Sequence, residues 1–257
     1  MERPMEGYEA APVLPQIKHV DALRPFQWIA RGWDDLKHSP GPSFAHGLLL
    51  VAIGWLILFV SSTHIDLVAA AVSGFLLVGP VFGAAFYELS RLRRAGQPAN
   101  FDASLDGAVR NGKALVYLGA VLALLGIAWA WLSGLLFERY FGGDLPAVSE
   151  NTWRTVVDWD YAGFYLTFMS TGALLAAVAF ILSAVSAPML FDRRIATATA
   201  LLTSVKAVAV NPVAMLVWAL CIAVLTAIGF ATLLIGLVVI LPLLGHATWH
   251  AYRDMIP

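Results

Sequence analysis

Charge is scarce in this sequence, and its scarcity limits what the protein can be. Only 13% of the 257 residues are charged and 60% are hydrophobic, whereas about a quarter of the residues of a soluble domain are charged. The single cysteine, Cys221, excludes an internal disulfide and a metal site built from several cysteines. No basic block resembles a nucleic-acid-binding patch, so nucleic acid is not an expected partner.

Charged side chains are also missing from the middle of the long apolar runs. Aspartate, glutamate, lysine and arginine fall near the ends of these runs or between them. A charged group at mid-membrane is costly, and where it occurs it usually has a function. Its absence argues against an ion-coupled carrier with a central carboxylate, and against an acid–base pair or a nucleophilic triad. The residues therefore favour a non-enzymatic protein.

Six apolar stretches are each long enough for a membrane-spanning helix, which needs about 20 residues to cross a hydrocarbon core of about 30 Å. They are predicted at Phe44–Ser62, Leu67–Glu88, Ala114–Phe137, Ala162–Ser186, Pro212–Ile228 and Ala231–Trp249. The last two are nearly continuous, and Gly229 with its neighbours is the predicted turn between them. The predicted fold is all-α and polytopic, with six transmembrane helices in three tandem hairpins.

Positive charge is concentrated on one side of these predicted spans. Fourteen of the 16 lysines and arginines precede the first span, follow the sixth, or lie in the loops after the second and the fourth. The other two, Arg139 and Arg154, belong to an acidic loop on the opposite side. The positive-inside rule therefore places both termini in the cytoplasm and the acidic loop outside. Residues 1–24 are expected to form a flexible cytoplasmic tail without a cleaved signal peptide, and residues 25–257 the membrane domain.

A short amphipathic segment precedes each predicted hairpin. Such helices can lie at the membrane interface with the apolar face down, or pack against the cytoplasmic ends of the protein's own helices. Together with the hairpins they define three repeat units, at about 25–90, 98–190 and 194–252. The apolar stripes are Phe26, Ile29, Trp33 and Leu36 in the first segment, Phe101, Leu105, Ala108 and Val109 in the second, and Ile195, Ala198, Leu201, Val205 and Val208 in the third.

Prolines and small residues recur in a way that suggests triplication. A proline lies near the cytoplasmic end of each even-numbered span, at Pro80, Pro188 and Pro242. Because proline kinks a membrane helix, these residues are predicted to serve helix packing or to shape a shared cytoplasmic vestibule. Small residues that allow close helix packing are predicted at Gly83, Gly245, Gly112, Gly119 and Gly126, and Ser104 and Asn111 match Ser204 and Asn211 in spacing.

Histidines at the cytoplasmic boundary are the candidate site residues. His246 and His250 lie four residues apart near the end of the sixth span, His46 begins the first span and Glu88 ends the second. Imidazole and carboxylate groups suit a transition metal, and two histidines can ligate a haem. The alternative is that no cofactor is bound and the histidines hydrogen-bond to backbone, water or lipid headgroups.

Three segments carry a resemblance to a known family. They are Gly79-Pro80-Val81-Phe82-Gly83 with the following Tyr87-Glu88 and Arg93-Arg94, Ala187–Asp192, and Leu241–Arg253. The sequence resembles an uncharacterised bacterial family of six-helix integral membrane proteins, a domain of unknown function in which some members are labelled cytochrome c oxidase subunit I-like. The resemblance implies a helical inner-membrane protein without an assigned activity, and no catalytic or cofactor residue is carried over from it.

Three kinds of function are compatible with these patterns. The first is a non-enzymatic accessory or scaffold subunit that packs against a larger membrane complex, such as a respiratory one. Its partners would be the lipid bilayer and either other membrane subunits or further copies of itself. The second is a channel or facilitator for a small neutral or lipidic solute. The third is a haem- or metal-binding membrane protein that uses His46, His246 and His250.

Overall fold

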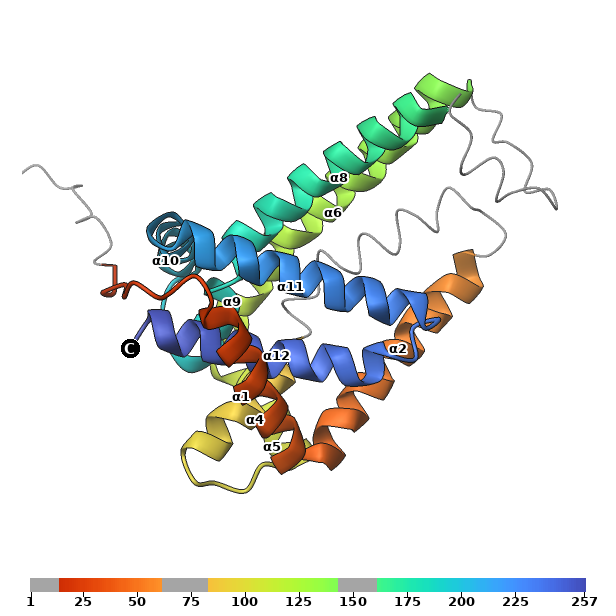
Figure 1. The fold of residues 1–257 in the computed structure, drawn as a ribbon. Helices are drawn as coiled ribbons and strands as arrows, with labels where there is room; N and C mark the ends of the chain where they lie inside the picture. Colours follow the sequence, from red (N-terminus) through yellow and green to blue (C-terminus); the bar gives the residue numbers. More distant parts are fainter. Residues whose placement is uncertain (1–13, 62–82, 143–160) are drawn as a thin grey trace, which may run out of the picture.

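The computed structural model describes residues 14–61, 83–142 and 161–257, and these ranges are built from α-helices (Figure 1). The all-α expectation is therefore confirmed. The helices are α1 (Arg24–His38), α2 (Pro40–Ser61), α4 (Ala84–Arg94), α5 (Phe101–Arg110), α6 (Gly112–Phe141), α8 (Ala162–Ser183), α9 (Ser186–Asp192), α10 (Thr197–Val210), α11 (Pro212–Ala231) and α12 (Leu237–Met255).

Four helical stretches in the described ranges are long and apolar enough to cross a membrane. They are Pro40–Val60, Gly112–Phe141, Ala162–Asp192 and Pro212–Ala231, and they correspond to the first, third, fourth and fifth predicted spans. Residues 67–82 of the second predicted span lie outside the described residues. The sixth predicted span corresponds to α12, which begins at Leu237 instead of Ala231 and is not one of the four.

The turn between α11 and α12 lies later than the sequence predicted. Gly229 is inside α11, and the chain reverses over residues 232–236. Leu233 and Leu234 there adopt positive φ angles of 53° and 69°, which are uncommon for leucine. The Thr232 hydroxyl stabilises the turn by accepting a 2.8 Å hydrogen bond from the Gly236 amide. The prediction of a turn at Gly229 was wrong. The glycine is needed there because the Leu237 side chain occupies the space that a Cβ atom would fill.

Helix α1 confirms the first amphipathic segment, and the face that it buries overlaps the predicted stripe in part. The buried face includes Trp28, Gly32 and Asp35. Phe26 and Trp33 of the predicted stripe are 55% and 45% exposed. These two side chains therefore point away from the protein, whereas Leu36 of the same stripe is 2% exposed and Ile29 packs against the core. A face containing glycine contacts α12.

The other two amphipathic helices also bury small or polar residues. Among residues 101–106 of α5, Ser104 is buried and Leu105 is exposed. In α10 a face of small and polar residues is buried, including Ser204, and Val205 is exposed. The Ser204 hydroxyl donates to the Ile181 carbonyl at 2.7 Å. Ile195, Leu201 and Val208 of the predicted stripe pack against the core. Hydrophobic periodicity thus predicted these helices and part of the face that the protein covers.

Each amphipathic helix ends in a corner of nearly constant geometry. One polar residue, Ser39, Asn111 or Asn211, separates it from the helix that follows. The φ and ψ angles are −127° and 59° at Ser39, −137° and 42° at Asn111, and −123° and 51° at Asn211. Helices α2, α6 and α11 begin at the next residue, at Pro40, Gly112 and Pro212.

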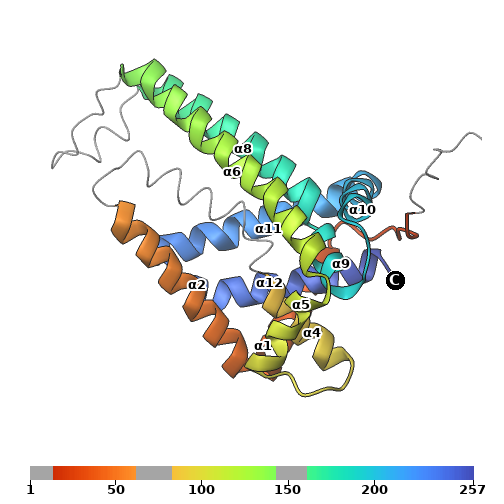
Figure 2. The same cartoon turned by 180° about the vertical axis from the view of Figure 1, so that it is seen from behind.

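The long helices diverge from a compact end where the short helices gather. Helices α6 and α8 run side by side as one pair and α11 and α12 as another, as both views show (Figures 1 and 2). Helix α1 lies on α12, α5 lies on α4, and α10 lies on α8 and α9. The Trp28 and Trp218 rings meet edge to face at 5.8 Å in the core of this end.

The segment before α1 crosses this compact end without forming a helix. The Lys18 amide donates to the Met255 carbonyl at 2.9 Å. Asn211 holds the same segment, because its Oδ1 accepts from the Val20 amide at 2.9 Å and its Nδ2 donates to the Lys18 carbonyl at 3.1 Å. Residues 1–13 of the predicted tail lie outside the described residues, and the flexibility of the tail stays a prediction.

Candidate functional site

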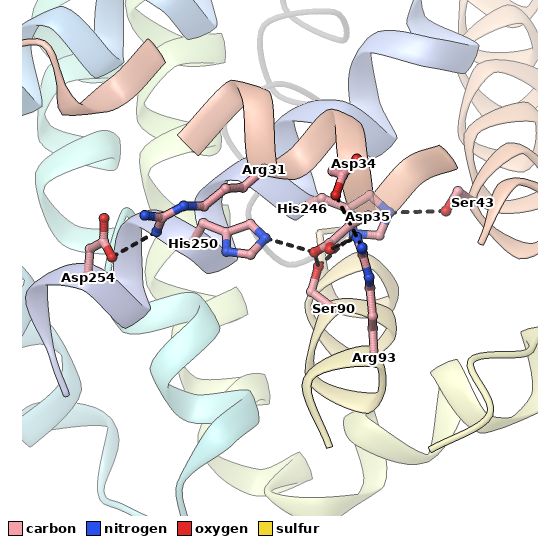
Figure 3. A network of polar contacts seen from close by, with 9 residues as sticks. All are labelled: Arg31, Asp34, Asp35, Ser43, Ser90, Arg93, His246, His250 and Asp254. Atoms are coloured by element: carbon pink, nitrogen blue, oxygen red, sulfur yellow. Dashed lines mark hydrogen bonds and ion pairs between the residues drawn. The ribbon is translucent and has the colours of Figure 1, made fainter. Parts of the chain in front are cut away.

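A chain of buried polar groups connects α1, α2, α4 and α12 at the compact end (Figure 3). Ser43 Oγ lies 3.0 Å from His246 Nε2, and His246 Nδ1 lies 2.8 Å from Ser90 Oγ. The Ser90 hydroxyl donates to the Asp35 carboxylate at 2.5 Å. All four residues are buried. Both ring nitrogens of His246 are therefore occupied by serine partners.

The direction of these hydrogen bonds assigns the tautomer of His246. Ser90 gives its only proton to Asp35, so its oxygen can only accept from His246. His246 therefore carries a proton on Nδ1, and its Nε2 accepts from the Ser43 hydroxyl. The imidazole is neutral in this arrangement. Every member of the chain has a partner, which is the condition for a stable buried polar network.

Asp35 is the centre of the network. Its carboxylate also accepts from Arg93 Nη1 at 2.6 Å and from His250 Nε2 at 2.8 Å (Figure 3). Burial opposes ionisation, but the hydrogen bonds from His250 and Ser90 outweigh it and hold the pKa of Asp35 below its ordinary value. The side chain is therefore an anion joined to α4 and α12 by charge-assisted hydrogen bonds.

A second carboxylate ties the ends of α1 and α12 together. Asp254 accepts from Arg24 Nε at 2.7 Å, from the Trp28 indole at 2.8 Å and from Arg31 Nη1 at 3.0 Å. Partial burial works against its charge, but these donors lower the pKa of Asp254. Helix α1 is thus held on α12 by ionic contacts at two points, Asp35 and Asp254.

His46 belongs to a separate contact. Its Nε2 lies 2.6 Å from Ser104 Oγ, which donates to the Phe101 carbonyl at 2.6 Å, so His46 is the donor to Ser104. The ring stacks on Phe101 with centroids 4.3 Å apart. Phe86 lies edge-on to both His46 and His246, at 6.0 and 5.8 Å. The two histidines therefore share an aromatic neighbour but have different polar partners.

The predicted metal set is not gathered around one point. His250 binds Asp35, and Glu88 pairs with Arg91 of its own helix at 2.6 Å. In the part of the chain that the structure describes, no group of three or more His, Cys, Asp or Glu side chains is placed to hold a metal ion. The histidines have the serine and aspartate partners that fit a hydrogen-bonding role, while haem binding stays a prediction.

The predicted packing residues lie beside this network. Pro242 is buried within α12. A Cβ atom at Gly47 would come within 3.1 Å of its ring, so α2 and α12 cross closely there. Gly245 lies against Phe86, where an added Cβ would be 2.6 Å from the Phe86 Cβ atom. Both contacts agree with the packing role that the sequence predicted for Pro242 and Gly245.

The remaining predicted packing residues are dispersed. Pro188 is buried in the short helix α9, and Gly83 precedes α4 next to the Tyr87 ring. Gly112 begins α6, and nothing lies within 4 Å of where its Cβ would be. Gly119 and Gly126 lie further along the same helix, and Pro80 falls outside the described residues.

A polar hollow of about 290 Å³ opens beside Asp35. It lies between α1, α4 and α12, and one wall carries the Arg93–Asp35 ion pair of 2.6 Å. Its lining residues are Arg31, Asp34, Asp35, Ser90, Arg93, Arg94 and His250. The sequence pointed to His250 through its spacing from His246. It did not single out Asp35, Ser90 or Ser43, because their partners are distant in the chain.

Comparison with known proteins gives a family but no activity. Residues 67–192 match the family model described as a predicted integral membrane protein, DUF2189. This segment is therefore similar to a family of predicted integral membrane proteins of unknown function, and the predicted resemblance to such a family is confirmed. Searches found no matching curated protein and no matching solved structure.

Proposed function

We propose that this chain is a non-enzymatic accessory or scaffold subunit of a larger complex in the bacterial inner membrane. The observation that carries the proposal is the small buried fraction of three of the four apolar stretches, α2, α6 and α11, while Ala162–Asp192 is half buried. In the most apolar 18-residue stretch of each helix, only 28% of α2 and 22% of both α6 and α11 are buried within the chain. Most of the surface of these helices is therefore available to lipid or to other membrane proteins.

Helix α6 has a surface suited to another helix. Ile127 and Trp131 are exposed, and Gly134 has no atom within 4 Å of where a Cβ would lie. These residues are four and three positions apart, so they share one helix face. A bare backbone next to large apolar side chains allows a second membrane helix to approach closely. Such a face fits a partner subunit or a second copy of the chain.

The proposal includes six spans with both termini in the cytoplasm. Helix α12 would be the sixth span, because its 19 residues correspond to about 28 Å of helix. It packs against α1, α2, α4 and α11, so its polar residues, such as His246, would face protein and not lipid. The outward apolar side chains of α1, such as Phe26 and Trp33, fit a helix lying in the membrane interface.

We also propose that the chain is a triplicated hairpin unit. Each amphipathic helix packs on the last helices of the preceding unit: α5 packs on α4, and α10 packs on α8 and α9. Helix α1 of the first unit packs on α12 of the third, which closes the series. Asn111 donates to the Arg193 carbonyl at 3.2 Å, in the segment before α10. Asn211 holds Lys18 and Val20 in the segment before α1. The two equivalent asparagines thus support equivalent junctions.

The test is the size of the particle extracted from the native membrane. Extraction in a mild detergent should give a complex larger than the 27.7 kDa chain, with one or more membrane proteins in fixed ratio. Gly134→Leu should weaken this association by filling the bare face of α6. Gly41→Leu, a glycine with equally empty surroundings in α2, should leave it intact. A monomer free of other proteins would contradict the proposal. The channel and the haem or metal alternatives stay predictions.

A further inference from the structure

We infer that the polar hollow between α1, α4 and α12 binds a phosphate-bearing anion. This inference is independent of the accessory role, since it concerns the polar end of the molecule and not its apolar faces. The hollow has a volume of about 290 Å³ and is lined by seven polar or charged residues. That volume is close to the lower end of the range of about 300–1,000 Å³ for small-molecule sites.

The cationic groups of the hollow are only partly neutralised. Arg93 is committed to the Asp34 and Asp35 carboxylates. Arg31 uses Nη1 to bind Asp254 at 3.0 Å, which leaves its other N–H groups for a ligand. Arg94 is exposed and makes no ion pair within the described ranges. His250 uses Nε2 for Asp35, and its Nδ1 is uncommitted among the described atoms. Donors from three helices thus converge on one space.

The charge balance favours an anion over a cation. Three arginines and two aspartates give the lining a formal charge of +1, without counting His250. Both aspartates are already paired: Asp35 with Arg93 at 2.6 Å, and Asp34 with Lys37 at 3.1 Å. No carboxylate of the lining is left to hold a metal ion or an amine. An anion would instead complete the pairing of Arg94 and Arg31.

Phosphate suits these donors better than a small spherical anion does. A guanidinium group presents planar pairs of N–H donors that match two phosphate oxygens. On α1, Arg31 lies on the side away from Phe26 and Trp33, and Asp34 lies about a quarter-turn from them, because successive residues turn by about 100° around the helix. If Phe26 and Trp33 face the bilayer, the hollow opens toward the cytoplasm. The phosphate can then belong to a soluble compound or to a lipid headgroup at the interface.

The experiment uses the full-length chain and two sources of phosphate. In the first arm, the chain in a non-ionic detergent is titrated with sodium phosphate at constant ionic strength, and heat and thermal unfolding are measured. In the second arm, thermal unfolding is compared in nanodiscs of phosphatidylcholine alone and with phosphatidylglycerol added. The variant is Arg94→Gln, which removes no ion pair. The matched control is Arg194→Gln, an exposed arginine outside the hollow.

The expected result is stabilisation of the wild type and of Arg194→Gln in at least one arm. Arg94→Gln should bind about tenfold more weakly, the loss expected for one charge-assisted contact. A response to phosphate alone identifies a soluble ligand, and a response to phosphatidylglycerol alone identifies a lipid headgroup. The inference is overturned if neither arm responds, or if Arg94→Gln and Arg194→Gln respond equally. The phosphate result does not depend on the accessory role, so a monomer in the detergent extraction experiment would leave it unchanged.

Discussion

Gly32 of α1 lies directly against the backbone of Ala247 in α12. A Cβ atom at position 32 would come within 2.7 Å of the Ala247 nitrogen and 2.9 Å of the Leu243 oxygen. Backbone atoms cannot rotate away as a side chain can, so this spacing requires glycine. The contact brings α1 close enough for Asp35 and Trp28 to reach α12. It is therefore a precondition of the polar network.

Gly32→Ala should destabilise the protein although alanine is the better helix former. The added methyl group forces α1 away from α12, and overpacking of this kind costs about 1–3 kcal/mol. Thermal unfolding in detergent measures the effect as a lower midpoint. Gly41→Ala is the matched control, because no atom lies within 4 Å of its Cβ position. That control should be neutral or stabilise by about 1 kcal/mol. Equal midpoints for the two variants would contradict the close contact.

Asp35→Asn should destabilise the compact end while preserving the shape of the side chain. Asp35 is 5% exposed, so its contacts with Arg93 and His250 are sheltered from solvent. Hydrogen bonds to a charged group contribute about 1.5–3 kcal/mol each, and a loss of about 2 kcal/mol in unfolding free energy is expected. Asp106→Asn, at an exposed site on α5, serves as the control and should change stability by less than about 0.5 kcal/mol.

The same carboxyl group predicts a direction for the pH dependence. The pKa of Asp35 is lower in the folded protein than its ordinary value of 3.8. A group of this kind stabilises the folded state above its unfolded pKa, and the contribution disappears as the pH falls through the folded pKa. Thermal midpoints measured between pH 6 and pH 3 should therefore fall toward acid, and Asp254 should add to the effect. The fall should be smaller in Asp35→Asn; a parallel decline in both proteins would exclude Asp35 as its source.

Asn211→Ala should release the segment before α1. The Asn211 side chain binds both Lys18 and Val20, and alanine offers neither the acceptor nor the donor. Hydrogen exchange at the Val20 amide should become at least about tenfold faster, as expected if a contact of about 1.4 kcal/mol is lost. Asn100→Ala, which removes the cap of α5 at Ala103, should leave Val20 unchanged. Unaltered exchange at Val20 in Asn211→Ala would show that other contacts hold the segment.

Periodicity and composition predicted the helices because both are local properties of the sequence. The stripe of Phe101, Leu105, Ala108 and Val109 predicted an amphipathic helix, and all four residues lie in α5. The covered faces were predictable only in part, through residues such as Leu36 and Leu201. Gly32, Ser104 and Ser204 are small, and a hydrophobic pattern assigns no burial to them. Their burial follows from close helix crossings that only the tertiary structure defines.

The candidate site illustrates the same limit. His246 and His250 were found because they are four residues apart on one helix. The partner of His250 is Asp35, 215 residues away, and Asp35 lies outside the apolar stripe that was predicted for the first amphipathic segment. A single sequence contains no signal that joins these two positions. The turn after α11 was misplaced for a related reason, since Gly229 is used for contact with Leu237 and not for chain reversal.

The central claim is that the compact polar end lies in the cytoplasm, with six spans between it and the outer face. Single cysteines in a Cys221→Ser background test it directly, by labelling intact cells with a membrane-impermeant maleimide. The account predicts that Arg139→Cys and Ile235→Cys react from outside. Gln97→Cys and Arg194→Cys should react only after the membrane is opened. Labelling of position 97 or 194 in intact cells, or protection of position 235 until the membrane is opened, would contradict it.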